Sequence, residues 1–271
     1  MSAQKVRLLL SDVDGTLVTP TKVLTERTID AVKKLREANI FFAITSGRPP
    51  RGISMFVEPL NLTTPLAAFN GGVVIDRDMQ ILEQRTIRDD LVHPTIEILT
   101  THGMSVWVYQ GADWLVLDSK GPHIQRESLA CQFEPAQIAN FDEVGGGVAK
   151  IVGVSDDTKV VSAARSAIQD RFGNDVSATS SQTYYIDVTH PDANKGRVVD
   201  FLAAKYDIPP RQIATIGDMQ NDLLMFERSG LSIAMGNALD DVKVAANQVT
   251  RSNDDEGFAY AVENFILNLE N

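Results

Sequence analysis

The sequence is poor in cysteine, in basic residues and in long apolar runs, and each shortage excludes a class of protein. Its single cysteine, Cys131, cannot form an internal disulfide bond, which favours a reducing compartment. Lys and Arg number 25 against 36 Asp and Glu, a formal charge of −11, so a nucleic acid is not the expected partner. No segment approaches the roughly 18 apolar residues of a membrane span, and the apolar run at residues 8–10 is too short for a signal peptide. We therefore expect a cytoplasmic protein with no membrane partner, and the sequence leaves its oligomeric state open.

The rest of the composition is that of an ordinary globular protein. Hydrophobic residues make up 44% and charged residues 23% of the sequence, which excludes intrinsic disorder. The length of 271 residues corresponds to about two domains. Apolar runs at residues 6–10 and 40–44 predict buried strands, and apolar residues at helical spacing over 29–36 predict a helix between them. A strand, a crossover helix and a second strand predict a parallel sheet with helices on its faces.

The pattern changes in the middle of the chain. Alternating residues at 104–109 and 114–118 predict an antiparallel hairpin, and a helix and further strands complete an α+β block. The strand and helix alternation then returns and ends in a helix predicted over residues 257–269. We therefore predict an α/β fold in which residues 1–83 and 189–271 form a Rossmann-like open parallel sheet. Residues 84–188 form an inserted α+β domain.

Acidic residues follow two of the predicted core strands at their carboxyl ends, where open parallel sheets bind ligands. Asp12 and Asp14 are two positions apart in an extended segment, so their side chains point the same way. Helical spacing places Asp218, Asn221 and Asp222 on one face of a helix. Two carboxylates about 4 Å apart repel each other by roughly 4 kcal/mol at an effective dielectric of 20, so four in one small volume require a cation. Hard oxygen ligands in a compact site favour Mg²⁺.

Hydrogen-bond donors follow the other strand ends. The Ser46 hydroxyl and the Gly47 amide can donate to a phosphoryl oxygen, and Lys195 at the start of a helix adds a positive charge. One carboxylate can then attack phosphorus while a second handles the proton of the leaving group. These residue types predict metal-assisted phosphoryl transfer.

Four motifs in order resemble those of the haloacid dehalogenase-like (HAD) superfamily of phosphohydrolases. Residues 12–17 read DVDGTL, similar to its DxDGT signature, and they are followed by Ser46, by Lys195 within NKG, and by residues 217–222, GDMQND. The stretch between Asp14 and Ser46 holds only one helix and one strand, whereas the stretch between Ser46 and Lys195 has room for an inserted domain. This spacing resembles the Cof-type phosphatase subfamily, whose inserted domain is a C2B cap.

The resemblance implies a Mg²⁺-dependent phosphatase of small phosphomonoesters, with sugar phosphates expected first and nucleotide or cofactor phosphates as alternatives. It implies that Asp12 is the nucleophile that forms an aspartyl-phosphate and that Asp14 is the general acid and then the base. It implies that Ser46 and Lys195 hold the phosphoryl group. The Mg²⁺ ligands that it implies are Asp12, the Asp14 carbonyl and Asp218, supported by Asn221 and Asp222.

Further substrate contacts are expected at residues that follow the strand ends, namely Gly47, Arg48, Asn70, Gly71, Asn194 and Asn221. For the asparagines before glycine, a plain turn is an equal alternative. Asp218 and Asp222 have ordinary helix-terminus roles as alternatives to metal binding. The aromatic residues of the predicted hairpin, Trp107, Tyr109 and Trp114, are expected to pack in the core rather than touch the substrate.

Two rival functions remain open at the level of sequence. One is a phosphomutase or a dedicated sugar-phosphate phosphatase of a related C2B-capped family. The other is a phosphometabolite-binding protein that has lost turnover, although loss of an acid would then be expected, and Asp12, Asp14 and Asp218 are all present.

Overall fold

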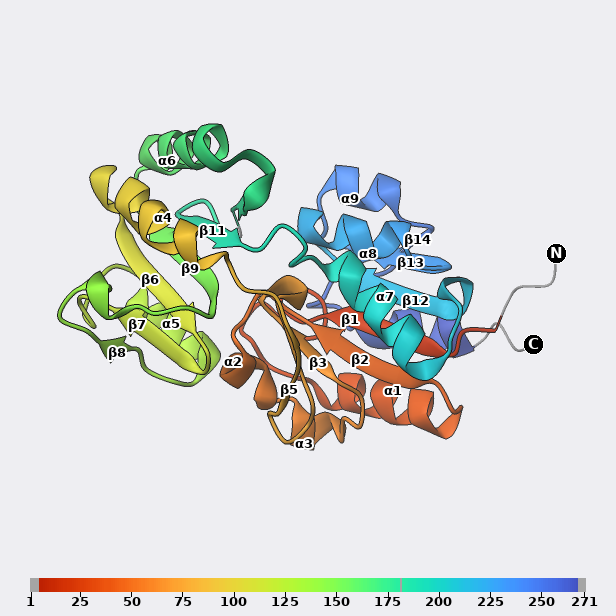
Figure 1. Cartoon of the computed structure of the whole chain (residues 1–271). Helices are drawn as coiled ribbons and strands as arrows, with labels where there is room; N and C mark the ends of the chain where they lie inside the picture. The colour runs from red at the N-terminus through yellow and green to blue at the C-terminus, as the bar shows by residue number, and fades with distance from the viewer. Residues whose placement is uncertain (1–4, 181, 268–271) are drawn as a thin grey trace.

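The computed structural model describes residues 5–180 and 182–267 and consists of two parts, each built on its own sheet (Figure 1). We call them the core and the cap. The core sheet has the strand order β14 (Gln248–Val249), β13 (Leu231–Ala234), β12 (Ile213–Gly217), β1 (Leu8–Asp12), β2 (Phe41–Thr45), β3 (Leu66–Ala68), β4 (Val73–Ile75) and β5 (Ile81–Gln84). Its first six strands in this order pair in parallel, and β4 and β5 are added antiparallel.

Helices cover both faces of the core sheet, which is why β1 is buried along its whole length. Leu9 points to one face and packs with α1 (Glu26–Glu37) and α10 (Gly257–Ala261). Leu8 and Leu10 point to the other face and pack with α7 (Lys195–Tyr206) and α8 (Leu223–Glu227). The shorter helices of the core are α2 (Pro50–Ser54), α3 (Val57–Leu60) and α9 (Asp240–Ala245).

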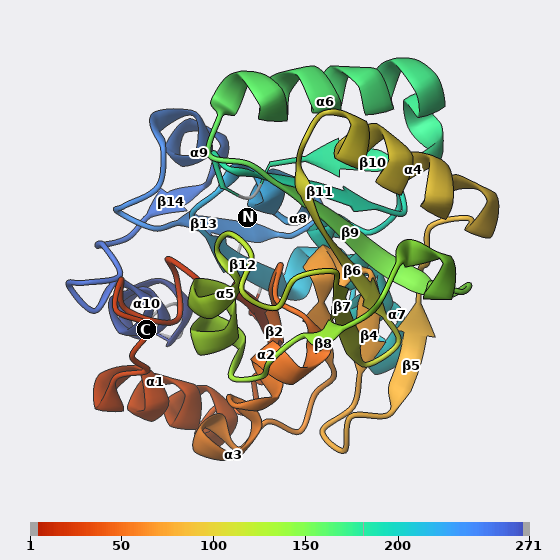
Figure 2. The ribbon, with the colours of Figure 1, turned by 90° about the vertical axis from the view of Figure 1, so that its left-hand side faces the viewer.

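The cap is an α+β unit that lies beside the core. Its sheet has the order β10 (Ser177–Thr179), β11 (Tyr185–Thr189), β9 (Val148–Val154), β6 (Ser105–Gln110), β7 (Asp113–Val116) and β8 (Ala136–Gln137). Two helices, α4 (Asp89–Thr101) and α6 (Thr158–Phe172), cover one face of this sheet (Figure 2). The opposite face, with α5 (Ile124–Cys131), is turned toward the core and shares a hydrophobic cluster with it.

The predicted α/β fold is confirmed by this architecture. Strand β5 belongs to the core sheet and β11 to the cap sheet, so the chain leaves the core after Gln84 and returns after Thr189. The division into 1–83 with 189–271 and 84–188 stays a prediction, and residues 1–4, 181 and 268–271 of these ranges lie outside the described residues. The helix predicted over 257–269 is α10 followed by a π-helix over Val262–Leu267, and its last two positions lie outside the described residues.

No helix among residues 5–180 and 182–267 is long and apolar enough to cross a membrane.

The cap touches the core through α5, whose end lies on α2. Nη1 of Arg48 in the core donates to the carbonyl oxygen of Ala130 at 2.9 Å. A Cβ atom on Gly52 would lie 3.2 Å from both Cβ and Sγ of Cys131. The two backbones approach so closely because residue 52 has no side chain.

This contact predicts that an engineered disulfide bond can join the cap to the core. The Cβ–Cβ separation of 3.2 Å is a few tenths of an ångström below the range of about 3.5–4.5 Å in disulfides, so after a small shift Gly52→Cys should cross-link to Cys131 on oxidation and hold α5 on α2. Since Cys131 is the one native cysteine, titration of free thiols before and after oxidation measures the bond directly. We expect two thiols in the reduced variant and none in the oxidised monomer. Two thiols that persist after oxidation would contradict the observed docking of the cap.

Candidate active site

The candidate site lies where the central core strands end. Strand β1 pairs in parallel with β12 on one side and with β2 on the other, and Asp12 lies opposite Thr45. The loops that follow these three strands therefore emerge side by side at one edge of the sheet. This register brings together Asp12, Ser46 and Asp218, as the sequence predicts.

Three carboxylates gather at this edge. Asp12, Asp218 and Asp222 each offer one oxygen, and these oxygens all lie within 4.8 Å of one another. All three residues are buried, and Asp222 is 0% exposed. Nζ of the buried Lys195 lies 2.5 Å from Oδ1 of Asp12 and 2.5 Å from Oδ1 of Asp222. We call these four residues the acid cluster.

Within the acid cluster, Asp222 has partners on both oxygens. Its Oδ1 accepts from Lys195, and its Oδ2 accepts the backbone N–H groups of Asp218 and Met219, both at 2.9 Å. Asp222 therefore fixes the turn that carries Asp218. Asp218 itself accepts weaker bonds, from Thr16 at 3.4 Å and from Asn237 at 3.2 Å.

Asp12 differs from the other acids because one of its oxygens is unused. Oδ1 is held by Lys195, whereas the buried Oδ2 has no hydrogen-bond partner among the described residues. Burial raises the pKa of Asp12 well above its usual range; Lys195 opposes this effect, and the charges of Asp222 and Asp218 add to it. For Asp218, burial and the charge of Asp222 raise the pKa to about 7.

The donor set of the acid cluster fits a divalent cation. Three buried carboxylates face one ammonium group, so the cluster holds more negative than positive charge when all its members are ionised. Carboxylate oxygens are the ligands that hard divalent cations prefer. The position of Gly15 is part of this arrangement: a Cβ there would lie 2.1 Å from Oδ2 of Asp218, and its φ of +84° is one that L side chains rarely adopt.

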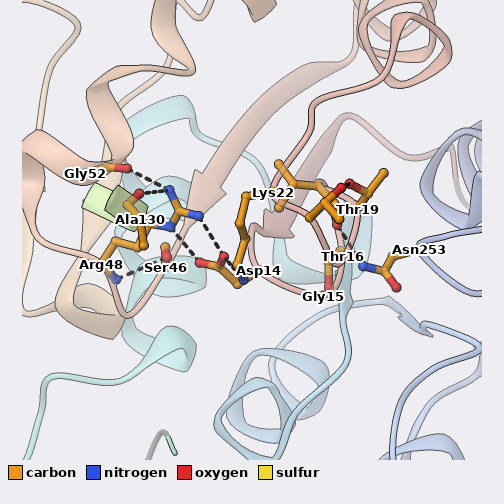
Figure 3. Close-up of polar contacts among 12 residues, drawn as sticks. Asp14, Gly15, Thr16, Thr19, Lys22, Ser46, Arg48, Gly52, Ala130 and Asn253 are labelled. Carbon is orange, nitrogen blue, oxygen red and sulfur yellow. Dashed lines mark hydrogen bonds and ion pairs between the residues drawn. The ribbon is translucent and has the colours of Figure 1, made fainter. Parts of the chain in front are cut away.

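Asp14 has a separate set of partners (Figure 3). Arg48 donates to both of its oxygens at 2.7 Å, and Nζ of Lys22 donates to Oδ1 at 2.6 Å. Burial alone would raise the pKa of Asp14, but the hydrogen bonds and charges of Arg48 and Lys22 outweigh it and lower the pKa to about 2. The Asp14 carboxyl group is therefore ionised in this structure.

Lys22 is a site neighbour that sequence reasoning missed. It lies in the loop between β1 and α1 with a φ of +65° and reaches back eight residues to Asp14. A loop lysine belongs to no periodic pattern and to none of the four motifs, so the sequence holds no signal for it. The sequence predicts Arg48 as a substrate contact, and in the structure its guanidinium group joins Asp14 to the cap through Ala130.

Several of the remaining predicted residues are linked to Ser46, directly or through Asn70. Oγ of the buried Ser46 accepts the N–H of Arg48 at 3.1 Å, which leaves its own O–H to be donated elsewhere. The N–H of Asn70 donates to the Ser46 carbonyl at 2.8 Å, and the Asn70 side chain accepts from Asn221 at 3.1 Å. Gly47 lies next to this group, since a Cβ there would be 3.6 Å from Oδ1 of Asn70.

Asn194 has a clear structural use. Its side chain accepts the N–H of Arg197 at 3.1 Å and so caps the helix α7, whose first residue is Lys195. Gly71 allows the close approach of this cap, since a Cβ there would lie 2.8 Å from the Asn194 carbonyl oxygen. Asn194 therefore positions the helix start that carries Lys195 into the acid cluster. Its predicted contact with substrate stays a prediction.

Comparison with known proteins places this arrangement in a family. The sequence profile of haloacid dehalogenase-like hydrolases matches residues 9–262. The chain belongs to this family. HAD hydrolases generally use a divalent metal ion, in agreement with the acid cluster, and the resemblance predicted from the four motifs is confirmed.

Relatives of this HAD hydrolase are phosphatases. It is 26% identical to the 5-amino-6-(5-phospho-D-ribitylamino)uracil phosphatase YwtE of Bacillus subtilis, covering 96% of this chain and 98% of the relative. It is 27% identical to the pyridoxal phosphate phosphatase YbhA of Escherichia coli, covering 96% and 99%. A crystal structure of a haloacid dehalogenase-like hydrolase from Bacteroides thetaiotaomicron superposes with a TM-score of 0.89 at 26% identity, covering 96% of this chain and 100% of that one. The chain is an HAD-type phosphatase of phosphorylated small molecules.

The acid cluster predicts how stability depends on pH when no divalent cation is present. The folded-state pKa of Asp218 is about 7 against an ordinary 3.8, so between these values the folded state binds more protons than the unfolded state. The free energy of unfolding should therefore fall as the pH rises from about 4 to 7, and Mg²⁺ should reverse the fall. Urea unfolding in a chelator and in Mg²⁺ measures both effects. Asp218→Asn should flatten the pH dependence, and a slope equal to that of the wild type would contradict the assignment.

Proposed function

We propose that this HAD phosphatase hydrolyses small phosphomonoesters through a covalent phosphoryl intermediate on Asp12, with Mg²⁺ held at the acid cluster. The observation that carries the proposal is the state of Asp12. Lys195 fixes Oδ1 of this carboxylate, and its buried Oδ2 has no partner among the described residues. An oriented carboxylate with one unengaged oxygen at a site rich in donors is suited to act as a nucleophile.

In the first displacement, an oxygen of Asp12 forms a bond to phosphorus and the bond from phosphorus to the alcohol oxygen breaks. The departing oxygen takes a proton from Asp14. In the second displacement, Asp14 accepts a proton from water, which attacks the phosphorus and releases phosphate and the Asp12 carboxylate. Ser46 and Lys195 hold the phosphoryl oxygens through both steps, since each brings a donor to the same edge of the sheet.

The ionised form of Asp14 is the one that the proposed second displacement requires. Arg48 and Lys22 keep its carboxyl group ionised, which suits a base. The first displacement requires the protonated acid, so at least one of these cations must withdraw when substrate binds. Because Arg48 also bonds Ala130 of the cap, this exchange is coupled to the position of α5.

Mg²⁺ would be held by Asp12, Asp218 and Asp222, together with the Asp14 carbonyl that the family resemblance implies. When bound, the ion offsets negative charge on the carboxylates and on the phosphoryl group. Such an ion would compensate the charge of the three buried acids that meet at this point of the fold.

For the substrate, we propose a sugar phosphate first, with nucleotide or cofactor phosphates as alternatives. The two relatives named above act on a phosphorylated ribitylamino uracil and on pyridoxal phosphate. Family membership therefore does not determine which alcohol the substrate phosphate is attached to. The shared name of phosphatase favours transfer to water over a phosphomutase. We expect the enzyme to act in the cytoplasm, which stays a prediction.

Asp12→Asn should abolish turnover. The amide is a poor nucleophile of nearly the same shape, so we expect phosphate release to fall by about 10³-fold or more while the protein stays folded. Phosphate release from a panel of phosphomonoesters, with Mg²⁺ and with chelator, measures this loss and the dependence on the ion. Asp78→Asn, the same change at an exposed position of the core, is the matched control and should leave turnover unaltered. Full hydrolysis by Asp12→Asn would refute the proposed nucleophile.

A further inference from the structure

The cap sheet presents a row of polar side chains to the core. Lys150 on β9 lies directly opposite Tyr109 on β6 and Thr189 on β11, and cross-strand partners share a face. Asp187 is two residues before Thr189, so it is on this face as well. The ring centroid of Tyr109 lies 5.1 Å from that of Phe69 in the core. Nζ of Lys150 lies 6.0 Å from the centroid of the Phe69 ring. The row therefore faces the core and not solvent.

Phe69 ties this row to the candidate active site. Its N–H donates to the Arg48 carbonyl at 3.0 Å, and the next residue, Asn70, bonds to Ser46 and to Asn221. The loop that carries the candidate phosphoryl-binding residues thus lies next to the ring under Lys150. An alcohol attached to a phosphoryl group at that loop would extend toward the cap face.

Asp187 is a buried acid whose carboxylate oxygens lack hydrogen-bond donors among the described residues. It is 3% exposed, and Lys150, 8% exposed, places its Nζ 2.7 Å from Oδ1. Neither carboxylate oxygen receives a properly directed hydrogen bond from any described residue. Buried Asp222, by contrast, accepts from Lys195 and from two backbone N–H groups. A buried carboxylate without donors is costly, so Asp187 is suited to donors that a ligand supplies.

The surroundings of Asp187 disfavour a second anion. Lys150 is the one buried cation of the cap residues that the structure describes, and Asp187 already balances it. Burial raises the pKa of the Tyr109 and Tyr185 hydroxyls, and the nearby carboxylates of Glu127 and Asp187 raise it further. Both hydroxyls therefore stay protonated beside two negative charges.

We propose that Asp187 and Lys150 form a specificity pair that binds the alcohol part of the substrate, and that this part carries hydroxyl groups and no second phosphate or carboxylate. Asp187 accepts hydrogen bonds from the hydroxyl groups, and Lys150 donates to an oxygen of the same part. The inference rests on the proposed function and deepens it. Neither residue touches the reacting phosphorus, so the pair selects the substrate and leaves the two displacements to the core.

The test compares substrates that differ in their alcohol. Glycerol 3-phosphate, ribose 5-phosphate and glucose 6-phosphate carry hydroxyl groups, p-nitrophenyl phosphate carries none, and fructose 1,6-bisphosphate adds a second anion. For Asp187→Asn we expect kcat/KM to fall by about 10- to 100-fold with the best of the three hydroxyl-bearing substrates, mainly through KM. The value for p-nitrophenyl phosphate should stay within about twofold, since its alcohol makes no bond to Asp187.

Two further variants keep the test decisive. Asp175→Asn removes an exposed cap acid that pairs with Arg88 and should change none of the values. The double variant Lys150→Gln with Asp187→Asn removes both charges together, so it tests the pair without an unpaired buried charge if the single variant fails to fold. Thermal unfolding of each variant confirms that the cap is intact.

Three outcomes have distinct meanings. A selective loss with the hydroxyl-bearing substrate supports the specificity pair. An equal loss with p-nitrophenyl phosphate, or a wild-type preference for the bisphosphate, overturns it and leaves the proposed function standing. If the wild type releases phosphate from no member of the panel, the proposed function fails and the specificity pair fails with it.

Discussion

The structure depends on one electrostatic arrangement, the ammonium group of Lys195 between the carboxylates of Asp12 and Asp222. These groups come from α7, from the end of β1 and from the turn after β12, so the ion pairs tie three distant parts of the chain at one buried point. Removing Lys195 would leave its two buried carboxylate partners without a compensating charge, a cost of several kcal/mol. The surrounding backbone is fixed around these groups. Asn194 caps the helix that begins with Lys195, and Asp222 accepts two backbone N–H groups of the turn that carries Asp218. The excess of acid over base at this point fits a divalent cation.

The cap is tied to this part of the core through Arg48. Arg48 joins Asp14 to the carbonyl of Ala130, so the proposed general acid and the cap helix α5 share one guanidinium group. The close contact of Gly52 with Cys131 fixes the helix on the same side. The proposed proton-transfer group and the docked cap are therefore linked through the side chain of Arg48, which touches both. The cap face beyond this contact carries the buried pair of Lys150 and Asp187, which we propose to bind the alcohol part of the substrate.

The sequence predicts much of this because the core obeys local rules. Apolar runs that end in polar turns locate β1, β2 and β12, and the parallel order then forces Asp12, Ser46 and Asp218 to one edge. Trp107, Tyr109 and Trp114 are buried, as expected. What escaped prediction depends on tertiary contact: the reach of Lys22 to Asp14, the bond of Arg48 to a cap carbonyl, and the pairing of Lys150 with Asp187 across two strands. No period or motif encodes these contacts. Lys22 meets Asp14 through the conformation of one core loop, Lys150 meets Asp187 when two strands of the cap sheet pair, and only the bond of Arg48 to Ala130 requires the cap to dock on the core.

The central claim is that Asp12, held by Lys195 and left with one unengaged oxygen, takes up the phosphoryl group. Acid quenching during turnover, followed by mass spectrometry of the peptide that contains Asp12, tests this most directly. The account predicts a phosphoryl group on Asp12 that hydroxylamine removes, as expected for an acyl phosphate, and no such group when Mg²⁺ is chelated. Rapid phosphate release with Asp12 unmodified at every quench time, and with the phosphoryl group on another side chain, would contradict it.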